Sequence, residues 1–231
     1  MKKIGFLILA LCSLCLTSCL DELDNYDAPN GGIKGRILDA STGQPIPLPV
    51  QGSGGVIIRL YEQGTNASQS VDFYAKQDGT FENSQVFNCD YLVVAEGPFE
   101  QNPEGTVKVS GQTTFDLTAT PMARIEASAT ASGRIVTINY KVTPSKANYQ
   151  VSEVYGIWNY APGVDNGGAN QAGKKTVSDT SGSITFNLDE ESNFKDYQYK
   201  IKSNGNKIYL RVGARTEGKI NYSEVMEVTV N

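Results

Sequence analysis

Short segments in which apolar and polar residues alternate, separated by turn-forming residues, dominate this 231-residue chain from residue 31 onward. A period of two places successive side chains on opposite faces of an extended strand, so each such segment predicts a half-buried strand. The segment 33–39, IKGRILD, is typical. No segment has a convincing helical period, and no internal repeat is visible. The sequence therefore predicts an all-β fold.

The predicted strands fall into two sets of seven. Pro121 separates the sets, because a proline ends the strand before it. We expect a β-sandwich domain over residues 31–121 and a second one over 122–231. The Asp78-Gly79 pair predicts a tight hairpin between the third and fourth strands, since such a turn needs a positive φ. The predicted strands are 33–39, 56–61, 71–75, 81–87, 91–95, 107–109 and 114–119, followed by 124–130, 135–142, 152–160, 174–178, 183–188, 208–216 and 222–230.

The first domain resembles a known module. The pattern I-x-G-x-I-x-D-x-x-T-G-x-P-I from Ile33, the D-G-x-F turn at Asp78 and the Y-x-V-V strand at Tyr91 resemble the carboxypeptidase regulatory-like, transthyretin-type β-sandwich. This resemblance implies a non-catalytic module. The segments 135–144 and 209–215 resemble strands B and F of fibronectin type III domains, which implies an immunoglobulin-like second sandwich.

The N-terminus predicts export and lipidation. Lys2 and Lys3 precede an apolar stretch, 4–16, that is too short to span a bilayer. The following Leu16-Thr17-Ser18-Cys19 resembles a lipobox, which predicts a signal peptide over 1–18 and acylation of Cys19. The alternative is an ordinary secretory signal with a coincidental cysteine.

Residues 19–30 form an acidic tether, with four carboxylates between residues 21 and 27. This run resembles the signal that sends Bacteroidetes-type lipoproteins to the outer surface of the cell, although a flexible tether would have the same composition. The whole chain, with its N-Y-D-A-P start at 25–29, resembles a Bacteroidetes outer-membrane lipoprotein family of unknown function. That resemblance implies a link with glycan-uptake systems. We expect a lipid-anchored outer-membrane protein, exposed on the cell surface.

Composition excludes most catalytic chemistry. The chain has no histidine, which rules out Ser-His-Asp and Cys-His hydrolases and histidine-ligated zinc. Cys89 is the one thiol left after processing, and we expect it to be buried and structural. The mature protein has a net charge of −7, which repels nucleic acid. No cofactor or metal ion is predicted. A glycosidase using the acidic stretch 189–196 remains an alternative, but a solvated turn explains those carboxylates better.

A sugar site is predicted where Trp158 and Tyr160 meet the loop 161–173, which carries Asp165, Asn166 and Asn170. An aromatic ring stacks on sugar C–H groups, while amides and carboxylates bind hydroxyls. The alternative is a core tryptophan beside an ordinary loop. The loop also loosely resembles a calcium loop but lacks the ligand spacing.

Three functions remain open. The first is a non-catalytic glycan-binding or accessory component of a polysaccharide uptake system, whose partners would be the membrane, saccharides and proteins of the uptake complex. The second is a structural or adhesive scaffold that binds other proteins. The third, a carboxylate glycosidase, fits least.

Overall fold

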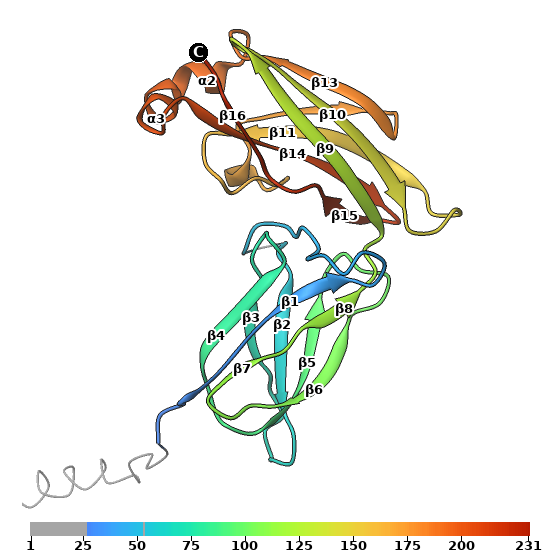
Figure 1. The fold of residues 1–231 in the computed structure, drawn as a ribbon, viewed down its shortest axis with the longest axis vertical. Helices are drawn as coiled ribbons and strands as arrows, with labels where there is room; N and C mark the ends of the chain where they lie inside the picture. The colour runs from blue at the N-terminus through green and yellow to red at the C-terminus, as the bar shows by residue number, and fades with distance from the viewer. Residues whose placement is uncertain (1–26, 53) are drawn as a thin grey trace, which may run out of the picture.

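The computed structural model describes residues 27–52 and 54–231 as two β-sandwiches stacked end to end (Figure 1). Strands account for 52% of the structure and helices for 7%, which confirms the expected all-β fold. The predicted signal peptide, the lipidation site Cys19 and the tether up to residue 26 lie outside the described residues. Neither described helix is long and apolar enough to cross a membrane.

The N-terminal sandwich contains two four-stranded sheets. In the first, β1 pairs antiparallel with β4 and parallel with β7 and β8. The second has the order β3-β2-β5-β6. Alternate residues of both sheets meet in one core, in which Ile33, Ile37, Tyr91 and Val93 are fully buried. The strands are β1 Gly31–Asp39, β2 Ile57–Glu62, β3 Val71–Tyr74, β4 Thr80–Val86, β5 Asp90–Glu96, β6 Glu104–Lys108, β7 Gln112–Thr114 and β8 Leu117–Ala119.

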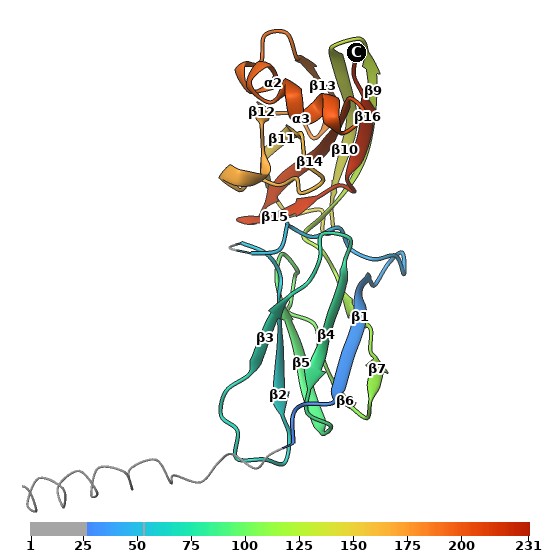
Figure 2. The ribbon, with the colours of Figure 1, turned by 90° about the vertical axis from the view of Figure 1, so that its left-hand side faces the viewer.

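The turn at Asp78-Gly79 forms, but the predicted hairpin does not. Gly79 has φ +82°, and the Lys76 N–H donates to Thr80 O at 2.7 Å. Beyond this bond β3 and β4 diverge, because β3 pairs with β2 whereas β4 pairs with β1 of the other sheet. The turn is therefore a corner between the two sheets, as Figure 2 shows.

The C-terminal sandwich packs a three-stranded sheet, β13-β10-β9, against the sheet β12-β11-β14-β15, in which β16 also pairs with β14. Two short helices, α2 and α3, lie between β13 and β14, where no helix was predicted. The elements are β9 Ala123–Ser132, β10 Ile135–Pro144, β11 Val151–Asn159, η2 Gly168–Asn170, β12 Gly173–Val177, β13 Ser181–Asn187, α2 Ser192–Asp196, α3 Gln198–Ser203, β14 Lys207–Thr216, β15 Lys219–Tyr222 and β16 Met226–Thr229.

Two predicted strands are each split in two, because side chains replace backbone partners. Asp116, between β7 and β8, accepts the Arg36 N–H at 2.9 Å. Ser223, between β15 and β16, accepts the Val212 N–H on its Oγ at 3.0 Å. In both places a side-chain oxygen takes a donor that a strand carbonyl would otherwise pair.

Strand β11 is buried on both faces. Val154 and Trp158 face the main core, whereas Tyr155 and Ile157 face a second cluster that includes Val164 and Tyr222. The predicted strand 152–160 thus follows the period of two, with Trp158 on the side of Val154 and Tyr155 on the side of Ile157. Trp158 has no exposed surface and packs edge-on against Phe194 at 6.2 Å. A Cβ on Gly173, its cross-strand neighbour, would lie 2.2 Å from the indole Nε1, so only glycine fits there.

Candidate functional site

The loop predicted to bind a ligand docks against the N-terminal sandwich. Asp165 Oδ2 accepts the Val50 N–H at 2.8 Å, and its Oδ1 accepts two N–H groups of its own loop, one of them from the Asn170 amide at 2.9 Å. The Gln77 amide of the first domain donates to Pro162 O at 2.9 Å. Asp165 thus joins the two domains, and both of its carboxylate oxygens are occupied, one of them by the Asn170 amide.

A buried arginine lies at the centre of the junction. Arg211 is fully buried, and its guanidinium donates to Ser223 O at 2.7 Å, to Val164 O at 3.2 Å and, across the junction, to Leu48 O at 2.8 Å. Tyr222 covers it, with the guanidinium carbon 4.9 Å from the ring centroid. No carboxylate among the described residues pairs with Arg211, and burial lowers its pKa to about 10.

Further polar contacts tie the domains together. Arg124 binds Asp39 with both Nε and Nη2, at 2.6 and 2.7 Å. Burial opposes ionisation of Asp39, but the hydrogen bonds from Arg124 and Ser41 outweigh it, so the Asp39 pKa lies below its ordinary value. The Asn221 amide spans the junction, donating to Pro98 O and accepting the Ala123 N–H.

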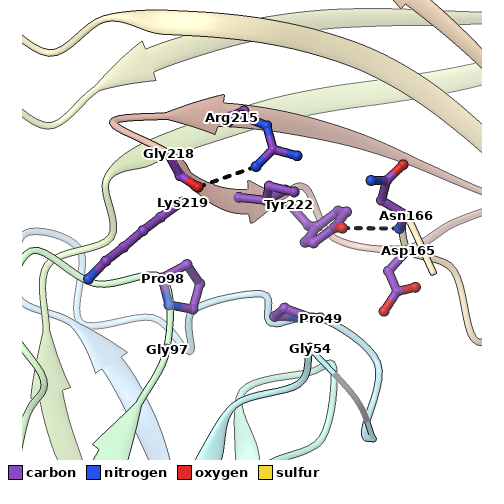
Figure 3. A pocket seen from close by; sticks show the side chains of 11 residues that line it. Pro49, Gly54, Gly97, Pro98, Asp165, Asn166, Arg215, Gly218, Lys219 and Tyr222 are labelled. Atoms are coloured by element: carbon purple, nitrogen blue, oxygen red, sulfur yellow. Dashed lines mark hydrogen bonds between the residues drawn. The ribbon is translucent and has the colours of Figure 1, made fainter.

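A cleft of about 340 Å³ opens between the domains at this junction (Figure 3). Loops of the N-terminal sandwich form one wall, the β14–β15 hairpin forms the other, and Asp165 and Asn166 lie at one end, as Figure 3 shows. Clefts between domains are common ligand sites, because two rigid units present groups from several directions. The lining residues are Pro49, Gly54, Gly97, Pro98, Asp165, Asn166, Arg215, Gly218, Lys219, Ile220 and Tyr222.

Apolar and polar groups are interspersed in this cleft. Pro49, Pro98 and Ile220 offer apolar surface, and Arg215, Lys219 and Asn166 offer hydrogen-bonding groups. Tyr222 is held in place because its hydroxyl accepts the Asn166 N–H at 3.0 Å. Burial raises the pKa of Tyr222, so its hydroxyl stays protonated at neutral pH. Such a surface can bind a ring with apolar and hydroxylated edges.

A second hollow of about 450 Å³ at the same junction also includes Tyr222. Its lining contains Pro45, Pro47, Pro121 and Ile125, and Arg124 in its wall is already paired with Asp39. The 340 Å³ cleft is the stronger candidate, because it contains two of the predicted site residues, Asp165 and Asn166, and two cationic side chains, Arg215 and Lys219.

The residues predicted to form the sugar site do not lie together in one place. Trp158 is a core residue, so the stacking platform predicted for it is wrong, because a fully buried ring has no face for a ligand. Tyr160 is half-buried and stacks on Tyr197 at 4.3 Å, with Lys200 Nζ 4.6 Å from its ring centroid. Of the predicted residues, only Asp165 and Asn166 line the cleft.

The remaining candidates from the sequence do not form a site. Asp189 is exposed and pairs with Arg134 at 2.6 Å. Cys89 is half-buried against the first core, more exposed than expected. Among the described residues, no three Cys, Asp or Glu side chains are grouped to hold a metal ion.

Sequence reasoning missed Arg211, Arg215, Lys219 and Tyr222. One signal was present, because Arg211 interrupts an otherwise apolar strand centre, Leu210-Arg211-Val212. A charge in such a run indicates a specific buried contact. Lys219 and Tyr222 carry no comparable signal, since exposed hairpins often contain such residues.

Several solved structures have this fold. A DUF3823 family protein from Parabacteroides merdae is 23% identical, with a TM-score of 0.73 over 88% of this chain and 100% of its own. One from Bacteroides ovatus is 19% identical, with a TM-score of 0.69 over 87% and 99%. A Bacteroides uniformis protein named "putative carbohydrate binding protein" is 21% identical, with a TM-score of 0.68 over 87% and 100%.

No curated protein matches the chain. Two family models do match it. The N-terminal domain of DUF3823, described as a protein of unknown function, matches residues 31–120, and the domain of unknown function DUF3823_C matches residues 123–227. Together these matches span both sandwiches. The chain belongs to the DUF3823 family.

Proposed function

We propose that this protein is a non-catalytic carbohydrate-binding lipoprotein that uses the junction cleft as its saccharide site. The observation that carries the proposal is the cleft itself, in which apolar surface from Pro49, Pro98 and Ile220 alternates with the polar groups of Asn166 and Arg215. Saccharides are bound by this combination, because their rings have apolar C–H faces and hydroxyl edges. The name of the Bacteroides uniformis relative supports the same class of ligand.

The composition of the cleft supports binding without hydrolysis. A glycosidase needs two carboxyl groups about 5–10 Å apart on either side of the scissile bond. Asp165 is the only carboxylate among the described residues that line the cleft, and it accepts three N–H groups. The chain also has no histidine, the side chain that most often acts as a general base.

Lipidation at Cys19 would anchor the protein in the outer membrane, and the acidic tether would direct it to the cell surface. Strand β1 begins at the far end of the N-terminal sandwich and ends at the junction, where Asp39 binds Arg124 (Figure 1). Its nine residues span about 27 Å. The first sandwich would therefore act as a spacer that holds the cleft away from the membrane, a suitable arrangement for an accessory protein of polysaccharide uptake.

A glycan array probed with the full-length protein, purified in detergent, tests this proposal. We expect selective binding to one class of saccharide, reduced by Asn166→Ala and unaffected by Asn148→Ala, an exposed asparagine outside the cleft. A blank array would contradict saccharide binding and favour the scaffold hypothesis. Binding that survives every cleft substitution would move the site elsewhere.

A further inference from the structure

The polar groups left free in the junction cleft are mainly hydrogen-bond donors. Arg215 uses Nη1 on Gly218 O at 3.3 Å, which leaves its Nη2 without a partner among the described residues. Lys219 Nζ donates to Phe99 O at 2.7 Å and has two further protons. Asn166 Oδ1 accepts from Lys174 at 3.0 Å, so its amide NH₂ is the free part of that side chain.

The acceptors of the cleft are largely occupied. Asp165 is 6% exposed, and both of its carboxylate oxygens accept N–H groups. The Tyr222 hydroxyl oxygen accepts the Asn166 N–H at 3.0 Å and lies 3.5 Å from the Tyr155 hydroxyl, which donates to it. A ligand must therefore bring acceptors to this cleft, because most of the lone pairs that could receive its protons are taken.

The cleft is positively charged, whereas the protein as a whole is negatively charged. Two cations, Arg215 and Lys219, line it together with a single carboxylate, Asp165. Behind Tyr222 lies the guanidinium of Arg211, which no described carboxylate contacts. Glu153 lies 3.5 Å from Arg215 but is shared with Lys174 at 3.1 Å. The cleft is thus locally positive in a chain of net charge −5.

We propose that the saccharide bound in this cleft is anionic, with its carboxylate or sulfate group held between Arg215 and Lys219. This inference rests on the proposed carbohydrate function and specifies its ligand class. A guanidinium binds planar oxyanions through paired N–H groups, and an ammonium adds a compact charge beside it. A neutral sugar would gain little from these two cations.

Isothermal titration of the full-length protein in detergent tests the inference with matched ligands. Trigalacturonate and its methyl ester have the same backbone, but only the first carries carboxylates. We expect trigalacturonate to bind at least tenfold more tightly, and this difference to shrink as salt is raised from 50 to 500 mM. A sulfated galactose oligosaccharide, titrated in parallel, distinguishes sulfate from carboxylate as the preferred anion.

A double variant locates the anion. Arg215→Gln with Lys219→Gln should abolish the preference for the charged ligand, so that the acid binds no more tightly than the ester. The control, Arg36→Gln with Lys202→Gln, changes the net charge equally at exposed positions outside the cleft and should retain the preference. If the cleft variant fails to fold, titration of the unaltered protein with the acid and the ester still tests the preference for an anionic saccharide.

The outcomes separate the two proposals. Equal affinity for acid and ester, or a glycan array that reports only neutral saccharides, overturns the anionic preference while carbohydrate binding stands. A folded double variant that keeps its preference for the acid places the anion elsewhere and also overturns it. If the array shows no binding to any saccharide, the proposed function itself has failed.

Discussion

Replacing Arg211 by methionine tests how the two sandwiches are coupled. The guanidinium makes three hydrogen bonds. Two go to Ser223 O and Val164 O in its own domain, and the third goes to Leu48 O across the junction. Methionine fills a similar volume without a donor. The substitution therefore removes the bonds and leaves three carbonyl oxygens without this donor.

The expected loss follows from two opposing effects. Hydrogen bonds from a charged donor contribute about 1.5–3 kcal/mol each, so the three together contribute about 5–9 kcal/mol. Removing a fully buried charge that has no carboxylate partner recovers several kcal/mol of desolvation free energy. We expect Arg211→Met to lower the free energy of unfolding by about 2–4 kcal/mol.

Urea denaturation followed by two signals measures both the loss and the coupling. Trp158 is the only tryptophan and lies in the C-terminal core, so its fluorescence reports that sandwich, whereas far-ultraviolet circular dichroism reports both. The unaltered protein should give coincident transitions, and Arg211→Met should separate them. Lys141→Met, at an exposed lysine in the same domain, serves as the control. A variant as stable and as cooperative as the unaltered protein would refute this account of Arg211.

Three other predictions concern the core, the junction and the membrane anchor. Trp158→Ala should cost about 3–5 kcal/mol in thermal or urea unfolding, since the ring is fully buried; a change below about 1 kcal/mol would contradict the core assignment. The Asp39 pKa is lowered on folding, so the ionised carboxylate stabilises the protein above pH 4, and this contribution disappears as the pH falls below the ordinary aspartate pKa of 3.8. Asp39→Asn should therefore flatten the loss of stability at acid pH. An unchanged acid loss would exclude Asp39 as its source. Cys19→Ala should release the protein from membranes or leave an uncleaved precursor, and a mature variant that still fractionates with membranes would show that the anchor is elsewhere.

Local pattern was enough to predict where most strands lie and that their side chains alternate between two faces. The period of two holds along β11, where Trp158 lies on the side of Val154 and Tyr155 on the side of Ile157. These assignments succeed because side-chain direction in a strand depends only on neighbouring residues. The Asp78-Gly79 turn was predicted on the same basis, but the hairpin predicted for its flanking strands is wrong, since each strand pairs with a partner in a different sheet.

Long-range contacts determined which strand faces are buried and where the cleft lies. Alternation distinguishes two faces of β11 but cannot say which is covered, and here both are, because the loop after Asn159 folds over the face of Ile157 while Trp158 enters the main core. The same loop reaches Val50, 115 positions away from Asp165. The sequence by itself determined an all-β architecture and the exclusion of histidine chemistry, and it predicts export. Only the tertiary structure brought Asn166 and Lys219 of the second sandwich opposite Pro49 and Pro98 of the first, because that proximity depends on how the two sandwiches dock.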